Sequence, residues 1–163
     1  MLHVALWEPE IPPNTGNVAR LCAATGTRLH LVGRLGFRTD DKTLKRAGLD
    51  YWPHVDLVTH PTMDAFLEAL FPLTPAPLPS GARGTTLWLI DNPAPTNYTR
   101  AAFAGGDILL FGSESKGLPE SARERFAGHL LGIPMPTGKV RSLNLATAVG
   151  VVLYEALRQI EDW

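Results

Sequence analysis

The stretch PMPTGKVRSLNLATAVGVVL, residues 134–153, changes character part of the way along. It begins with two prolines and a glycine, which favour a loop, and it continues as an apolar run with helical spacing. Three polar residues, Arg141, Ser142 and Asn144, stand at the junction, where a helix that only covers a core needs a single cap. Either Ser142 caps the helix and Asn144 satisfies a nearby carbonyl, or the junction carries a functional site.

Outward from this junction, short apolar runs alternate with helical stretches. The apolar runs predict strands at residues 3–7, 28–33, 55–59, 85–91, 107–112 and 129–134. The helical spacing predicts helices at residues 17–26, around 42–47, at 62–71 and at 142–161. The strands show little polar alternation, as is typical of a parallel sheet that helices cover on both faces. We therefore expect an α/β fold in a single domain that spans residues 1–163.

Local signals refine these elements. Asn14 or Thr15 is expected to cap the first helix, Gly26 to end it, and Thr62 to cap the helix at 62–71. Residues 72–84 contain four prolines and two glycines, so they predict a surface loop.

Composition limits the functional class. The 163 residues are 45% hydrophobic, which is typical of a globular protein. The single cysteine, Cys22, excludes an intramolecular disulfide framework, and its apolar helical context predicts a place in the core. No apolar run approaches the roughly 18 residues of a membrane span, and the first residues lack a basic leader region. We expect a cytoplasmic protein that does not enter a membrane.

The charge pattern bears on nucleic-acid binding. The net charge of −1 argues against a general polyanion binder, because nonspecific affinity grows with the number of cationic contacts. Seven Lys and Arg residues nevertheless lie between residues 20 and 46, against two acids. This basic segment is either a solvated face or part of a contact with nucleic acid.

The common phosphate, redox and metal motifs do not fit. GSESKGLP (112–119) has glycines at the spacing of a phosphate-binding loop, but Leu118 stands where that loop needs a lysine. The sequence has no G-x-G-x-x-G after the first expected strand and no G-x-S-x-G motif. The five histidines lack ligand spacing, so we expect no metal site.

Three loops are rich in functional groups: PPNTGNVAR (12–20), FGSESKGLP (111–119) and IPMPTGKVRSLN (133–144). Each follows an expected strand, and ligands in an open α/β sheet bind beyond the carboxyl ends of strands. Turn formation explains any one of these loops, but the three together favour a site.

Four stretches resemble motifs of the SPOUT superfamily of RNA methyltransferases, of the SpoU/TrmH type. They are EPEIPPNTGNVARLCAATG (8–26), DDKTLKRAGLDYW (40–52), LLFGSESKGLP (109–119) and IPMPTGKVRSLNLATAVGVVLYEALRQ (133–159). More narrowly, they are similar to the small TrmL-type enzymes, which methylate the ribose 2′-oxygen of the wobble nucleotide, C34 or U34, in tRNA. The resemblance covers nearly the whole chain.

The resemblance implies a parallel sheet flanked by helices, with a C-terminal trefoil knot over approximately residues 107–163, an exception to the general absence of knots. It also implies an S-adenosylmethionine pocket within the knot, a reaction without a metal, a homodimer, and the tRNA anticodon stem-loop as substrate. The broad apolar surface of the helix at 142–161 suits a dimer, and the anticodon loop exposes single-stranded nucleotides.

Particular residues acquire roles by the same resemblance. The cofactor shell would comprise Ile90, Gly112, Leu118, Ile133, Ser142 and Leu143. The catalytic residues would be Arg20, Glu114, Ser142 and Asn144, and the RNA would contact Asn14, Asn17, Arg20, Arg46 and Arg141. Because arginine stays protonated, we expect Arg20 to clamp a phosphate and the developing oxyanion and not to act as a base. Glu114 has a simpler alternative, as an acid in the first turn of a helix.

Two stretches depart from the family pattern, and the first is the loop at 72–84, which is longer and richer in proline than in the family. DNPAP (91–95) stands where a Thr-Thr-Lys-like stretch is expected, and Asp91 and Pro93 put a cationic contact to the substrate there in doubt. Three alternatives stay open: a 2′-O-methyltransferase of ribosomal RNA or of another tRNA position, a noncatalytic RNA-binding protein with a relict cofactor pocket, and an α/β interaction protein without a ligand.

Overall fold

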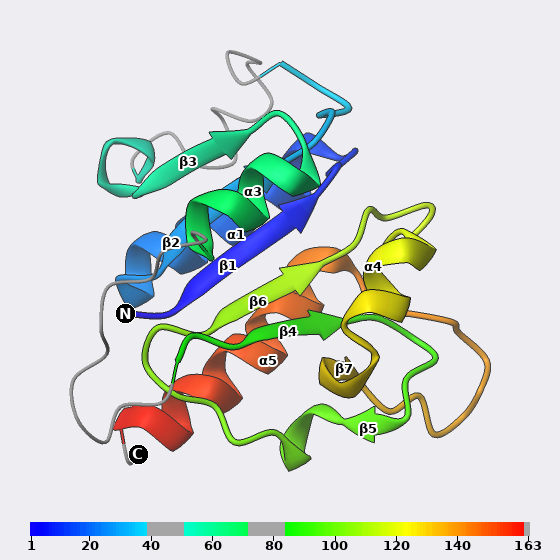
Figure 1. Ribbon diagram of the computed structural model, residues 1–163. Coiled ribbons are helices and arrows are strands. Elements are labelled where there is room, and N and C mark those ends of the chain that lie inside the picture. The colour runs from blue at the N-terminus through cyan, green and yellow to red at the C-terminus, as the bar shows by residue number, and fades with distance from the viewer. Residues whose placement is uncertain (39–50, 72–83, 162–163) are drawn as a thin grey trace.

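The computed structural model describes residues 1–38, 51–71 and 84–161, and a parallel β-sheet lies at its centre (Figure 1). In these ranges the sheet has seven strands in the order β3-β2-β1-β6-β4-β7-β5. They are β1 (His3–Trp7), β2 (Arg28–Val32), β3 (Leu57–His60), β4 (Leu87–Ile90), β5 (Thr96–Asn97), β6 (Ile108–Phe111) and β7 (Leu130–Gly132). All neighbouring strands run parallel, so their carboxyl ends share one edge. The predicted parallel α/β fold is confirmed.

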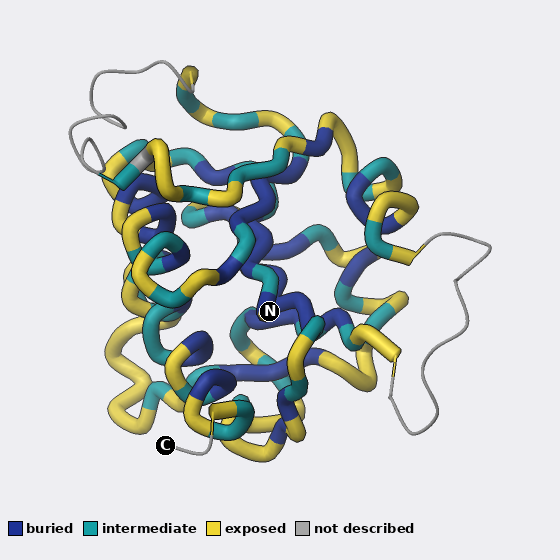
Figure 2. Tube along the Cα trace, turned by 90° about the vertical axis from the view of Figure 1, so that its left-hand side faces the viewer, coloured by how far each residue is buried: buried dark blue, intermediate teal, exposed yellow. Residues whose placement is uncertain are grey.

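Helices cover both faces of the sheet. The α-helices of the described ranges are α1 (Pro12–Thr25), α3 (Met63–Leu70), α4 (Glu120–Arg125) and α5 (Leu145–Glu161), and the short 3-10 helices are η1 (Trp52–His54), η2 (Tyr98–Arg100) and η3 (Ala127–His129). Val18 of α1 and Leu153 of α5 share one core cluster, and Phe66 of α3 and Ala122 of α4 belong to a second. The buried part of the chain follows the strands between these layers (Figure 2).

Strand β6 illustrates why the strands lack polar alternation. Its residues are all buried. Leu109 and Phe111 belong to the core under α1 and α5, whereas Ile108 and Leu110 belong to the core under α3 and α4. Because successive side chains point to opposite faces, a strand covered on both sides must be apolar throughout.

The first helix begins earlier than the sequence suggests. Helix α1 starts at Pro12, so Asn14 and Thr15 lie inside it, and the prediction that one of them caps it is wrong. The N-cap residue is Ile11, without a side-chain cap bond. Prolines at the start lack the N–H groups that a cap would satisfy, so this helix can begin without one. At the other end Gly26 adopts φ 64° in the left-handed region, as expected.

The later boundaries agree in part. Thr62 caps α3, as predicted, by accepting a hydrogen bond of 3.1 Å from the N–H of Ala65. Helix α5 begins at Leu145, and Asn144 accepts the N–H of Ala146 at 2.9 Å, so the alternative in which Ser142 caps this helix is wrong. Strand β5 and helix α4 were not predicted, because two and six residues are too short to display a clear period.

Two expectations lie outside the described residues, namely the basic helix around 42–47 and all but the last residue of the loop at 72–84. In the ranges that the structure describes, no helix combines the length and hydropathy needed to cross a membrane. Cys22 is fully buried, as predicted, and burial raises the pKa of its thiol to about 12.

Three histidines form a ladder across β1, β2 and β3. His3 Nδ1 lies 2.9 Å from His30 Nε2, and His30 Nδ1 lies 2.9 Å from His60 Nε2. Phe66 packs edge-on against the rings of His30 and His60. Burial, together with the neighbouring His3 and His60, lowers the pKa of His30 to about 3, and burial also lowers the pKa of His3 and of His60. Neutral rings suit the ladder, because each contact needs one donor and one acceptor nitrogen.

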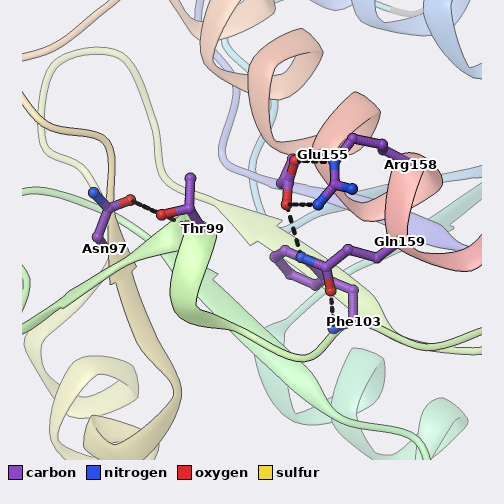
Figure 3. A network of polar contacts seen from close by, with 6 residues as sticks. All are labelled: Asn97, Thr99, Phe103, Glu155, Arg158 and Gln159. Atoms are coloured by element: carbon purple, nitrogen blue, oxygen red, sulfur yellow. Dashed lines mark hydrogen bonds and ion pairs between the residues drawn. The ribbon is translucent and has the colours of Figure 1, made fainter. Parts of the chain in front are cut away.

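The last helix is also joined to the segment that precedes β6. Gln159 accepts the N–H of Phe103 at 3.0 Å and donates to Glu155 at 2.8 Å (Figure 3). Glu155 forms an ion pair of 2.9 Å with Arg158 on the next turn of the same helix. The side-chain amide of Gln159 therefore links α5 to the loop at Phe103.

Candidate functional site

A cavity of about 640 Å³ lies beyond the carboxyl ends of β4, β6 and β7. Its walls come from the loops that follow these strands, from α4 and from the first turns of α1 and α5. All six residues expected around the cofactor lie on these walls: Ile90, Gly112, Leu118, Ile133, Ser142 and Leu143. The three loops singled out from the sequence therefore meet at one place, as the rule for open α/β sheets predicts.

The carboxylate of Glu114 organises the start of α1. Its Oε2 accepts the backbone N–H of Glu10 at 2.8 Å. Its Oε1 accepts the backbone N–H of Ile11 at 3.2 Å and the side-chain Nδ2 of Asn14 at 3.0 Å. An ionised carboxylate only accepts hydrogen bonds, so Glu114 fixes the direction in which the Asn14 amide points.

This orientation continues into the last helix. Because Asn14 donates to Glu114, its Oδ1 is left to accept, and Asn144 Nδ2 donates to it at 2.9 Å. The Oδ1 of Asn144 then accepts the backbone N–H groups of Ala146 at 2.9 Å and Thr147 at 3.3 Å. One chain of hydrogen bonds thus joins the loop after β6, the first turn of α1 and the cap of α5.

A second contact ties the same two loops together. Ser115 donates its hydroxyl to Glu10 Oε1 at 2.6 Å, and its backbone N–H to Glu10 Oε2 at 3.1 Å. Since Glu114 accepts the N–H of Glu10, the loop after β1 and the loop after β6 hold one another through reciprocal carboxylate contacts. This wall of the cavity is accordingly set by side chains and does not depend on loop packing alone.

The residues expected to contact RNA are only partly brought together. Asn14, which is buried, and Arg141, which is exposed, lie on the cavity wall, as do Ser142 and Asn144. Asn17 is an exposed residue of α1 outside the described lining of the cavity. Arg46 lies outside the described residues.

Arg20 occupies a separate place on α1. It lies six residues after Asn14, a rise of about 9 Å along the helix axis. Its guanidinium stacks over the ring of Tyr51, with Cζ 4.5 Å from the ring centroid, and Nη2 donates to the Tyr51 hydroxyl at 2.6 Å. In the described part of the chain Arg20 does not line the cavity, and its exposed guanidinium is held by Tyr51.

Two residues of the cavity wall were missed as site residues. Asp91 was noted only as a departure from the family pattern, and Arg123 was not singled out at all. The structure pairs them at 2.6 Å on the cavity wall. The available signal was the acid directly after a buried strand, because that position lies at the carboxyl edge of the sheet.

Among residues 1–38, 51–71 and 84–161, no group of three or more His, Cys, Asp or Glu side chains is placed to hold a metal ion.

Comparisons with known proteins agree with this geometry. Residues 1–154 match the SpoU rRNA Methylase family. A curated relative from Aeromonas hydrophila subsp. hydrophila, named tRNA (cytidine(34)-2'-O)-methyltransferase, is 46% identical over 161 residues, which cover 98% of this chain and 95% of the relative.

Solved structures give the same result. One, described as "Structural insights into the 2-OH methylation of C/U34 on tRNA", is 52% identical with a TM-score of 0.87 and covers 100% of this chain and 98% of its own. Another, an AdoMet-bound rRNA methyltransferase from Sinorhizobium meliloti, is 26% identical with a TM-score of 0.77, and the match covers 96% of this chain and 56% of that one. The family expected from the sequence motifs is confirmed: the chain belongs to the SpoU rRNA Methylase family.

Proposed function

We propose that the protein is an S-adenosylmethionine-dependent tRNA methyltransferase that modifies the ribose 2′-oxygen of the wobble nucleotide, C34 or U34. The observation that carries the proposal is the convergence on one cavity of six expected cofactor residues with the Glu114–Asn14–Asn144 chain. The names of the relatives and their full-length coverage give independent support.

The cavity fits the methyl donor in size and character. Its volume falls in the range of sites for small molecules, and apolar Ile90, Leu118, Ile133 and Leu143 supply walls for an adenosyl group. Gly112 contributes backbone without a side chain, and backbone N–H and C=O groups can satisfy an adenine edge. When bound, S-adenosylmethionine supplies an electrophilic methyl group on a positively charged sulfur.

The residues around the cavity provide positioning more than acid or base chemistry. Asn144 and Ser142 orient the ribose hydroxyl, which loses its proton to an oxygen of the substrate or solvent as the O–CH₃ bond forms and the S–CH₃ bond breaks. Arg20 and Arg141 hold phosphate groups, and Arg20 also stabilises the charge that develops on the oxygen. Glu114 acts through Asn14 and holds this arrangement in place.

The tRNA substrate is supported over a ribosomal one by sequence identity. The chain is 46% identical to the C34 enzyme and 52% identical to the C/U34 structure, but 26% identical to the rRNA methyltransferase. Asn14, Asn17, Arg46 and Arg141 complete the proposed RNA surface. The anticodon loop suits the proposed reaction, because its single-stranded nucleotides are accessible.

The assembly forms the rest of the proposal. Two chains form a homodimer in the cytoplasm, in which the basic segments of both subunits line one anticodon stem-loop. A trefoil knot over approximately residues 107–163 is part of the proposal, and it is supported by membership of the family.

Transfer of isotopically labelled methyl groups to unmodified bulk tRNA tests the proposed reaction. We expect wild type to transfer label, and Arg20→Ala to lose about 100-fold of the rate, as for removal of one oxyanion donor. Binding of S-adenosylhomocysteine to Arg20→Ala, measured by calorimetry, should match wild type because Arg20 does not line the cavity. Arg100→Ala removes an exposed guanidinium elsewhere and serves as the control. Wild type that binds S-adenosylhomocysteine but labels no RNA would support the noncatalytic alternative.

A further inference from the structure

One of the two stretches that depart from the family pattern, DNPAP (91–95), lies at the cavity and is held by hydrogen bonds. Asp91 follows β4 directly, and its Oδ1 accepts the backbone N–H of Asn92 at 2.8 Å. Its Oδ2 accepts the backbone N–H of Leu118 at 3.1 Å and Nη1 of Arg123 at 2.6 Å. Both carboxylate oxygens are therefore engaged by the protein itself.

Arg123 reaches this point from α4. Its Nη1 binds Asp91 and its Nη2 donates to the backbone oxygen of Pro93 at 2.9 Å, while Glu120 lies 3.6 Å from its Nε. The side chains of Asp91 and Arg123 are each only 19% exposed, so solvent screens this pair less than a surface ion pair. Residues 91–95 contain no cationic side chain of their own. The positive charge beside them is Arg123 of α4, which binds this stretch of the protein.

Close backbone packing shows how tightly the carboxylate is fitted. Gly117 adopts φ 69°, and a Cβ there would lie 2.9 Å from Asp91 Oδ2. A Cβ at Gly112 would lie 2.2 Å from the carbonyl carbon of Gly117. Only glycine at both positions lets the loop after β6 fold back under Asp91.

Asn92, the residue after Asp91, holds the loop that follows β7. Asn92 Nδ2 donates to the backbone oxygen of Ile133 at 3.0 Å. A Cβ at Gly132 would lie 2.6 Å from Asn92 Oδ1, so the end of β7 also approaches closely. Asp91 and Asn92 together tie the end of β4 to the loop after β6 on one side and to the loop after β7 on the other.

We propose that the Asp91–Arg123 ion pair is a positioning device that sets the separation of the loops after β4, β6 and β7 around the methyl donor. Ile90 ends β4 directly before Asp91, the backbone N–H of Leu118 donates to Asp91, and the backbone oxygen of Ile133 accepts a bond from Asn92. The inference rests on the proposed cofactor, and it assigns Asp91 and Arg123 no contact with it. Because both Asp91 oxygens already accept hydrogen bonds, the carboxylate preorganises the pocket and is not a ligand for the donor.

The affinity for S-adenosylhomocysteine tests this assignment. Asp91→Asn removes the ion pair and mismatches one of the three donors, and Arg123→Gln removes the pair and the contact to Pro93. We expect each to weaken binding by about 10-fold, and the double variant to be no weaker than Asp91→Asn, because contacting residues act as a unit. KM for S-adenosylmethionine should rise by a similar factor, with KM for tRNA unchanged and kcat within about twofold of wild type.

Two further variants serve as controls for this test. Arg158→Gln breaks a more exposed ion pair, to Glu155 on α5, away from the cavity, and should leave the affinity unchanged (Figure 3). Arg123→Lys retains the charge but not the bidentate fork, and it provides a milder change if the glutamine variant does not fold. Its affinity should fall between those of wild type and Arg123→Gln.

The outcomes test the positioning role separately from the proposed function. Wild-type affinity in folded Asp91→Asn and Arg123→Gln or Arg123→Lys would overturn the positioning role, as would effects that simply add in the double variant. A rise in KM for tRNA alone would also overturn it. Failure of wild type to bind S-adenosylhomocysteine would overturn the proposed function, and with it the positioning role of Asp91 and Arg123.

Discussion

Asn144 donates a hydrogen bond of 2.9 Å to Asn14, across 130 positions of sequence. The bond joins the cap of the last helix to the first turn of the first helix, which pack against each other on one face of the sheet. Glu114 fixes the direction of this bond, because it forces the Asn14 amide to present its oxygen to Asn144. The polar residues at the loop-helix junction therefore serve both the fold and the cavity.

A substitution of Asn144 separates these two roles. Asn144→Asp keeps an oxygen that accepts the N–H groups of Ala146 and Thr147, but it cannot donate to Asn14. We expect methyl transfer to fall at least about 10-fold with the cap of α5 kept, and the midpoint of thermal unfolding to fall because a carboxylate oxygen then faces Asn14 Oδ1. Asn144→Ala loses the cap as well and should lower the free energy of unfolding by about 1 kcal/mol. Full transfer activity in Asn144→Asp would contradict a role for the bond to Asn14.

The histidine ladder predicts an acid-sensitive fold. Burial first, then the neighbouring His3, His60 and Arg28, depress the pKa of His30 from 6.5 to about 3, so between these values the unfolded chain binds more protons than the folded chain. The free energy of unfolding should therefore be highest above pH 6.5 and should decrease as the pH falls toward about 3. Urea denaturation at a series of pH values measures this slope. His30→Gln cannot titrate and should have a smaller slope in this window, whereas equal slopes would exclude His30 as a major contributor.

Thr15 predicts a stabilising substitution. Over the described residues, Thr15 Oγ1 is a buried side-chain oxygen without a hydrogen-bond partner. Thr15→Val removes the hydroxyl at nearly constant volume and should raise the free energy of unfolding by about 1 kcal/mol. The buried hydroxyl of Thr27 accepts a bond of 2.9 Å from Thr25, so Thr27→Val should change stability in the opposite direction. Destabilisation by Thr15→Val would reveal a partner for this hydroxyl.

The fold was largely predictable because its signals are local. The apolar strands, Thr62 as a cap, Gly26 at a helix end and Cys22 in the core each depend on neighbouring residues. The start of α1 was misplaced because prolines open the helix without a side-chain cap. The segment before it is held by Glu114, about 100 residues further along the chain, which no local pattern reveals.

The sequence indicated which residues lie at the cavity better than it indicated the contacts between them. Ile90, Gly112, Ile133 and Ser142, which the family resemblance assigns to the cofactor, lie on the cavity wall. Arg123 could not be found in this way, because its importance depends on a tertiary contact with Asp91. Arg20 likewise stacks on Tyr51 instead of entering the cavity, and its own sequence context does not contain that partner.

Mass mapping of the methylated nucleotide tests the central claim most directly. Bulk tRNA is labelled by wild type with S-adenosylmethionine, digested, and analysed for the position and chemical site of the added methyl group, with Arg20→Ala alongside. We predict a methyl group on the ribose of nucleotide 34, absent with the variant. A methyl group on a base, on another nucleotide, or only on ribosomal RNA would contradict the proposed substrate.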